Sequence, residues 1–148
     1  MVLCASPRYV ERHGTPSTPD ELKDHPMISY SYLATGDEWE FSGPDGTPVR
    51  VRMSSRLHTN SGDTCRAAAL DAQGVILPPD FLVAADLRRG SLVELLPGYK
   101  GREFGIYAVY PSRQHLPVKT RRLVDYLVSE FRTPAWRDSS HPTQTGPV

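Results

Sequence analysis

The sequence predicts an α/β domain. Apolar residues recur at helical spacing in several segments, and short apolar or alternating segments typical of strands lie between them. Strands that alternate with helices in this way argue for an α/β fold. A chain of 148 residues is also long enough to bury one core of ordinary size.

The N-terminal region is predicted to hold one strand and two short helices. Residues 2–5 are apolar and strand-like. A buried strand seldom opens a chain, so this start suggests a piece of a longer protein. Ser6 can cap a helix over 7–13, which Gly14 ends. A capping box that contains proline predicts a second short helix over 18–25.

The next region changes to the period of strands. Turn sequences rich in Gly, Pro and Asp separate three predicted strands, at 27–32, 38–42 and 48–53. Trp39 and Phe41 share one face of the second strand, and we interpret both as core residues. In the third strand apolar residues alternate with arginines, which is typical of a half-buried strand. The arginines, Arg50 and Arg52, are interpreted as a solvated face rather than a phosphate-binding patch.

The C-terminal half alternates between helices and strands. Small and apolar residues at helical spacing predict a helix after residue 63, and the longest helix is predicted at 117–131. Between these two, we expect a buried strand at 74–77, a helix at 81–89 that Gly90 ends, and strands at 92–96 and 106–110.

The helix at 117–131 carries a continuous apolar stripe. Its members are Leu123, Val124, Leu127, Val128 and Phe131. Because a chain must bury such stripes to fold, we interpret this one as core rather than as a partner-binding face. Residues 133–148 are rich in Pro, Ser and Gly with little to bury, and are predicted to be a mobile, disordered tail.

Composition limits the classes of function. Lys+Arg and Asp+Glu both number 17, so there is no positive excess to bind a polyanion by counterion release, and we predict no direct nucleic-acid contact by this chain. Cys4 and Cys65 lack CxxC or zinc-site spacing, which fits a reducing compartment. No apolar run approaches the roughly 18 residues that span a bilayer, and no signal peptide is recognisable, so a cytoplasmic location is predicted.

Catalytic signatures are missing from the sequence. Its histidines show no HExxH spacing, and there is no GxSxG, P-loop or GxGxxG motif. His58 near Cys65 could mimic a Cys–His pair, but the intervening helix and the lack of a third orienting group argue against it. We therefore expect no enzyme activity, no catalytic residue, no cofactor and no metal.

Several blocks of sequence, in order and spacing, carry a family resemblance across residues 2–131. They are VLCASPRY at 2–9, WEF and GPDG within 39–46, NSGD at 60–63, LPPDFLVAADL at 77–87 and YAVYPSR at 107–113. Together they resemble the substrate-binding domain of LysR-type transcriptional regulators, which is similar to type 2 periplasmic binding proteins. The chain departs from the family's frequent Gly-x-Gly turn with Ala72-Gln73-Gly74.

The resemblance implies a type 2 periplasmic-binding-protein-like fold, with two α/β subdomains beside a cleft and two crossover strands between them. It makes residues 2–6 the first crossover and 7–103 one complete subdomain. Residues 104–132 become the C-terminal strand and helix of the other subdomain, so the partial domain is 1–132. The early half of that other subdomain and the DNA-binding helix-turn-helix are absent from this chain.

The candidate effector site is the segment Thr59, Asn60, Ser61 and Gly62. Hydroxyl and amide side chains beside the unpaired amides of a helix N-terminus suit a small anion, and the resemblance places this loop at the effector cleft. Asn60 or Ser61 could instead simply cap its own helix, and capping and ligand contact can coexist. Asp63 would weaken the binding of an anion.

Pro79 and Phe81 are a second candidate part of the site. They follow a predicted strand end, and ligands of open α/β sheets sit at the carboxyl ends of strands. Phe81 could be a wall of the cleft, or it could pack its helix onto the sheet as an ordinary core aromatic.

We interpret the chain as the small-molecule effector-sensing module of a bacterial LysR-type regulator. The effector would shift the relative positions of domains in a homo-oligomeric parent, which would contact DNA through its missing N-terminal domain. The alternative is a fragment of a solute-binding protein of a transport system. An enzyme on a related fold is a third possibility, without a catalytic constellation to support it.

Overall fold

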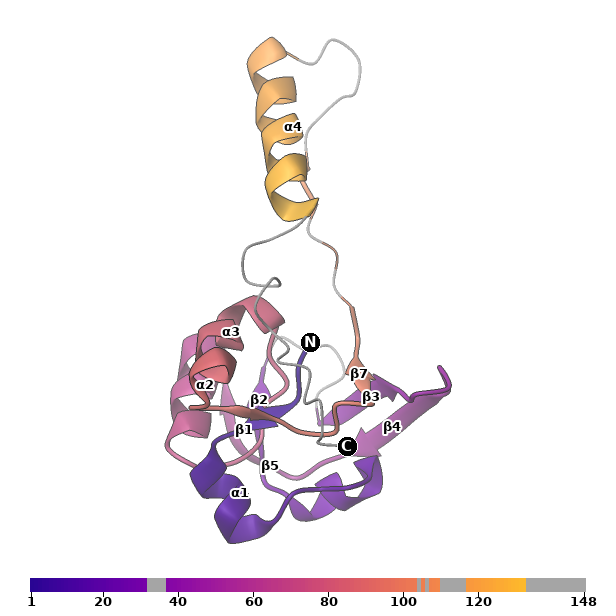
Figure 1. Ribbon diagram of the computed structural model, residues 1–148, viewed down its shortest axis with the longest axis vertical. Coiled ribbons are helices and arrows are strands. Elements are labelled where there is room, and N and C mark those ends of the chain that lie inside the picture. The colour runs from indigo at the N-terminus through magenta and orange to yellow at the C-terminus, as the bar shows by residue number, and fades with distance from the viewer. Residues whose placement is uncertain (32–36, 104, 106, 110–116, 133–148) are drawn as a thin grey trace, which may run out of the picture. The chain divides into compact units, whose positions relative to one another are not determined.

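The computed structural model describes residues 1–31, 37–103, 105, 107–109 and 117–132 (Figure 1). The chain divides into two compact units, Met1–Glu103 and Phe104–Val148. The first contains β1 Cys4–Ala5, α1 Pro7–His13, the 3-10 helix η1 Pro19–Asp24, β2 Met27–Tyr30, β3 Glu38–Ser42, β4 Pro48–Arg52, β5 Ser55–Thr59, α2 Gly62–Leu70, α3 Asp80–Arg89, β6 Val93–Glu94 and β7 Lys100–Gly101. The second contains α4 Val118–Arg132.

The centre of the first unit is a run of paired strands. β2 pairs in parallel with β5, and on its other side Met27 forms a parallel bridge with Val75. Ile76 forms an antiparallel bridge with Cys4 of β1, and β1 pairs antiparallel with β6. The order across this run is therefore β5, β2, residues 75–76, β1 and β6. Three of these segments, β5, β2 and 75–76, point the same way.

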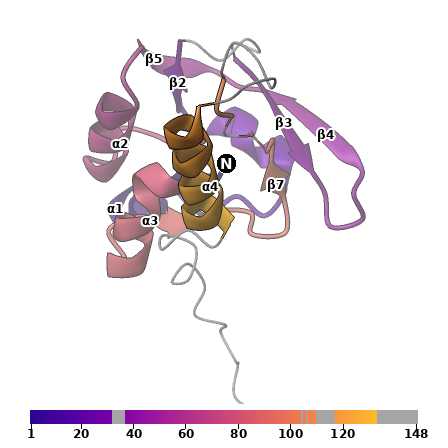
Figure 2. The same cartoon turned by 90° about the horizontal axis from the view of Figure 1, so that it is seen from above.

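A second sheet is built on the hairpin of β3 and β4, which extends away from α1, α2 and α3 (Figure 2). Its strand order is β4, β3, β7. Trp39 and Phe41 are buried at 2% and 1% exposure, with their rings edge to face at 6.4 Å. The predicted alternation of β4 is also confirmed, because Arg50 and Arg52 are exposed while Val51 is buried.

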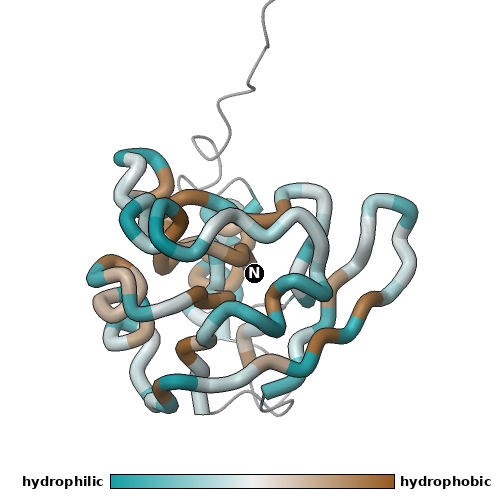
Figure 3. Tube along the Cα trace, turned by 90° about the horizontal axis from the view of Figure 1, so that it is seen from below, coloured by the Kyte–Doolittle hydropathy of each residue, from teal (hydrophilic) through white to brown (hydrophobic). Residues whose placement is uncertain are grey.

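Two clusters of buried apolar residues hold the first unit together. One joins α1, η1 and the hairpin, and its largest members include Tyr9, Leu22 and Phe41. The other packs α2 and α3 on the parallel strands and contains Ile28, Ile76, Val83 and Leu92. Hydrophobic stretches, brown in Figure 3, lie toward the middle of this unit, whereas hydrophilic stretches dominate its loops.

Several predicted elements differ in length or type. The second helix is a 3-10 helix rather than an α-helix. The strand predicted at 74–77 is reduced to two isolated bridges, and the one at 92–96 to β6. Residues 107–109 of the strand predicted at 106–110 have no regular structure, while 106 and 110 lie outside the described residues. The predicted tail at 133–148 also lies outside them.

Helix α4 begins and ends close to the prediction, but its apolar stripe is not a core. None of its residues is buried, and Leu123, Val128 and Phe131 expose 56%, 53% and 43% of their surface. Val124 and Leu127 are half-buried. The interpretation of the stripe as core is therefore wrong for this chain, because the described part of the second unit holds no other helix or strand that could cover it.

Candidate functional site

The candidate site lies at one edge of the parallel strands. Because β2, β5 and residues 75–76 run in the same direction, their carboxyl ends share that edge. A backbone hydrogen bond of 2.9 Å from Ser31 to Thr59 joins the ends of β2 and β5. At the third end, the amide of Val2 donates to the carbonyl of Pro78 at 3.0 Å. The first residues of the chain therefore border the same edge.

Ser61 caps α2 where the chain leaves β5. Its Oγ accepts from the amide of Thr64 at 3.3 Å, and its own amide donates to Thr59 Oγ1 at 3.2 Å. The capping alternative is therefore confirmed for Ser61. Capping uses one lone pair of the oxygen, so the hydroxyl hydrogen can still be donated to a ligand.

Helices α2 and α3 begin side by side at this edge. A Cβ placed on Gly62 would come within 3.0 Å of Leu82 Cδ2, so the first turns of the two helices are in contact. Four residues further along each helix, Arg66 of α2 pairs with Asp86 of α3. The helices therefore run parallel, and Gly62 lies against the first turn of α3, the turn that contains Phe81.

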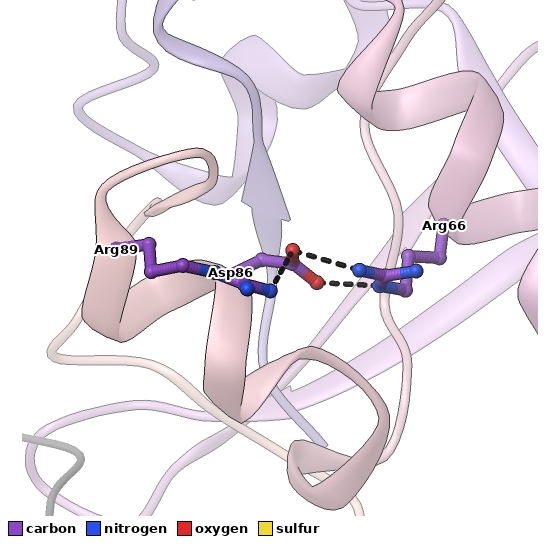
Figure 4. Close-up of polar contacts among 3 residues, drawn as sticks. All are labelled: Arg66, Asp86 and Arg89. Atoms are coloured by element: carbon purple, nitrogen blue, oxygen red, sulfur yellow. Dashed lines mark hydrogen bonds and ion pairs between the residues drawn. The ribbon is translucent and has the colours of Figure 1, made fainter.

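An ion-pair cluster fixes this arrangement (Figure 4). Arg66 Nε donates to Asp86 Oδ2, and Arg66 Nη2 donates to Oδ1 at 2.8 Å. Arg89 Nη2 donates to the same Oδ1 at 3.3 Å. The hydrogen bonds from Arg66 hold the pKa of Asp86 below its usual range, although burial acts in the opposite direction. We did not anticipate this pair; its signal is a carboxylate inside the apolar run of residues 81–87.

The predicted site residues differ in exposure. Thr59, Ser61, Gly62 and Pro79 are half-buried, and Asn60 is exposed. Phe81 exposes 55% of its surface at the first turn of α3, so the alternative that it packs α3 onto the sheet is wrong. Two carboxylates, Asp63 and Asp80, stand in the first turns of the helices and oppose the attraction of the helix dipoles for an anion.

The cysteines do not form a reactive site. Both are free and buried, and burial raises the pKa of Cys65 and raises that of Cys4 to about 12. A cysteine nucleophile needs the opposite shift. His58, which is near Cys65 in the sequence and was considered as its partner, is exposed on β5.

Within the part of the chain that the structure describes, no three His, Cys, Asp or Glu side chains gather as ligands for a metal. Among the described helices, none combines the length and apolar character needed to cross a bilayer.

Parallel strands whose carboxyl ends meet two helix N-termini define an α/β ligand-binding architecture. The LysR substrate binding domain family matches residues 1–132, and the chain belongs to this family. An uncharacterized HTH-type transcriptional regulator of Haemophilus influenzae is 36% identical over 117 residues, covering 79% of this chain and 40% of the relative. The HTH-type transcriptional activator AaeR of Escherichia coli is 30% identical and covers 88% of this chain.

Solved structures agree with this assignment. The regulatory domain of AphB from Vibrio vulnificus matches with a TM-score of 0.73 and 30% identity, over 86% of this chain and 63% of that structure. The chain spans 40% of the length of the Haemophilus influenzae regulator and 42% of that of AaeR. The matches favour a LysR-type regulator over a transport solute-binding protein.

Proposed function

We propose that this chain is the effector-sensing part of a LysR-type transcriptional regulator. We propose that it binds its small-molecule effector at the edge where the carboxyl ends of β2, β5 and residues 75–76 lie together. The observation that supports the proposal is the contact between the first turns of α2 and α3, where Gly62 lies against Leu82, the neighbour of Phe81. On this proposal, polar donors of the Thr59–Gly62 loop and the exposed Phe81 ring would contact the same ligand. Ligand sites commonly combine an apolar wall with a few polar groups of this kind.

The chemistry of the edge favours an effector with two different parts. Free amides in the first turn of α2, with the Ser61 hydroxyl and the Asn60 amide, offer donors to a carboxylate or a similar acceptor group. Pro79 and Phe81 offer an apolar surface to a hydrocarbon or aromatic part. Because Asp63 and Asp80 offset the helix dipoles, hydrogen bonding rather than net charge would dominate recognition of an anionic effector.

In the regulator, binding is proposed to act by a shift between conformations, without covalent chemistry. LysR regulatory domains bind small-molecule effectors. The partial domain would be 1–132, with α4 packed against the part of a regulatory domain that this chain lacks. DNA contact would belong to a separate helix-turn-helix of a homo-oligomeric, cytoplasmic protein.

The test is a calorimetric titration of the full chain with benzoate, which combines a carboxylate and an aromatic ring. Ser61→Ala and Phe81→Ala should each weaken binding at least about tenfold, or roughly 1.4 kcal/mol, while the protein stays folded. Ser17→Ala, which alters an exposed serine outside the site, is the matched control. If the site variants lower only the melting temperature, which a lost cap would do at about 0.5 to 2 kcal/mol, the loop is a cap and the proposal is wrong.

A further inference from the structure

A buried histidine lies where η1 passes into β2. Of the three histidines that the structure describes, His25 alone is buried, at 6% exposure, while His13 and His58 are exposed. The next residue, Pro26, accepts a hydrogen bond from Val75 at 3.0 Å. The backbone beside His25 is therefore fixed to the central strands, and its imidazole is held away from water.

The imidazole of His25 is joined to α1 through Tyr9. The Tyr9 hydroxyl and His25 Nδ1 are 2.8 Å apart, and Tyr9 is fully buried. Burial raises the pKa of Tyr9 to about 12, so its phenol keeps its proton. When the neutral imidazole carries its hydrogen on Nε2, Nδ1 accepts from the phenol. Protonation of His25 removes that acceptor, so that Nδ1 could only donate to the phenol oxygen and the imidazole would carry its charge in a buried position.

The charges around this pair come from α1, η1 and β4. His13 of α1 stacks on the Tyr9 ring with centroids 4.3 Å apart. On η1, Glu21 and Asp24 favour a charged His25, but both are exposed, and Glu21 already accepts from Ser17 and Thr18. Arg50 and Arg52 of β4, which packs along η1, are exposed, and Arg50 lies 3.7 Å from Glu40.

Burial is the largest effect on His25 and lowers its pKa, and His13 lowers it further. Folding therefore favours the neutral imidazole. At acid pH, protonation of His25 would place a positive charge next to the Tyr9 hydroxyl, in a desolvated position.

We propose that Tyr9, His13 and His25 form an acid-sensitive latch that fastens the α1–η1 segment, residues 7–25, to the central strands. The latch is closed while His25 is neutral and opens when His25 takes a proton. This device lies outside the proposed effector site and does not depend on it. Because the folded-state pKa of His25 is depressed, the stabilisation is complete above the ordinary histidine pKa of about 6.5 and is lost as pH falls below it.

The test is amide hydrogen exchange of the full chain from about pH 7.5 to about pH 5, across the histidine range, corrected for intrinsic rates. Peptides from residues 7–25 should lose protection selectively in acid, while peptides from α2 and α3 keep it. The factor by which the protection of residues 7–25 falls should approach the ratio of the His25 acid dissociation constants in the closed and open states. Equal loss in all peptides, or no loss in 7–25, would overturn the latch.

Variants separate the latch from general acid unfolding. His25→Asn keeps an acceptor for Tyr9 without titrating and should flatten the pH dependence of peptides 7–25, whereas His58→Gln, at an exposed histidine, should not change it. NMR titration of the wild type covers the case in which His25→Asn does not fold. His25 should titrate below about 6.5, and His13→Gln should raise its pKa. A His25 pKa at or above the ordinary value contradicts the proposal, as does an unaltered pH dependence in His25→Asn.

Discussion

Replacing Arg66 by methionine removes two of the three side-chain hydrogen bonds that Asp86 accepts, while it keeps an unbranched aliphatic stem at position 66. The Asp86 side chain is 4% exposed and that of Arg66 is 31% exposed. Breaking a fully buried pair costs about 3 to 5 kcal/mol, and a hydrogen bond to a charged group contributes about 1.5 to 3 kcal/mol. Because water reaches Arg66, we expect the free energy of unfolding to fall by about 2 kcal/mol.

Arg89→Met is the matched control, because Arg89 contacts the same carboxylate through one bond of 3.3 Å and its side chain is 65% exposed. It should cost under about 1 kcal/mol. Urea unfolding near neutral pH measures both variants, and a cycle with Asp86→Asn should give a coupling of at least about 1 kcal/mol between residues 66 and 86. Equal effects of the two arginine variants, or no coupling, would refute the reasoning.

The same pair predicts a pH dependence. A carboxyl whose folded-state pKa is lowered contributes stability that is present above its unfolded pKa and is lost as pH falls through the folded one. The difference between wild type and Arg66→Met should thus be constant near neutrality and shrink below about pH 4. A difference that stays constant to lower pH would mean that Arg66 acts through packing alone.

Three further predictions concern other parts of the chain. Gly74→Ala should lower the free energy of unfolding in urea more than Gly90→Ala does. A Cβ at position 74 would lie 2.4 Å from the Pro26 carbonyl oxygen, whereas a Cβ at position 90 would meet open space and only the strain of a φ of 71°, about 1 to 2 kcal/mol. The reverse order would contradict the packing at Gly74. The chain should self-associate in sedimentation through α4, and a Leu123→Glu, Phe131→Glu double variant should reduce this, whereas a monodisperse wild type would count against it. No sequence-selective complex with DNA should form in gel shifts at physiological salt.

Local signals in the sequence were enough to predict most helices. Pro7 and Gly14 marked the ends of α1, although the predicted cap Ser6 makes no side-chain capping hydrogen bond. The polar residues 60–61 marked the start of α2, where Ser61 is the cap. Strand β5 was missed because its sequence, SRLHT, has only one strongly apolar residue, and that residue, Leu57, is 38% exposed. Its strand conformation comes from pairing with β2, which local sequence does not encode.

The candidate site was predicted as two separate pieces. The contact that joins them, between Gly62 and Leu82, depends on the packing of two consecutive helices, which local sequence patterns do not encode. Spacing alone also could not assign Phe81, since an aromatic at a helix start can face either the sheet or solvent. The stripe on α4 illustrates the same limit, because its pattern predicts burial but does not say which segment covers it.

The central claim is that an effector binds where α2 and α3 begin. Backbone amide NMR spectra of the full chain, recorded during titration with benzoate, test it most directly. The account predicts saturable shift changes centred on residues 59–64 and 79–82, with the β3–β4 hairpin unaffected. Saturable changes centred elsewhere, with none in these two segments, would contradict it.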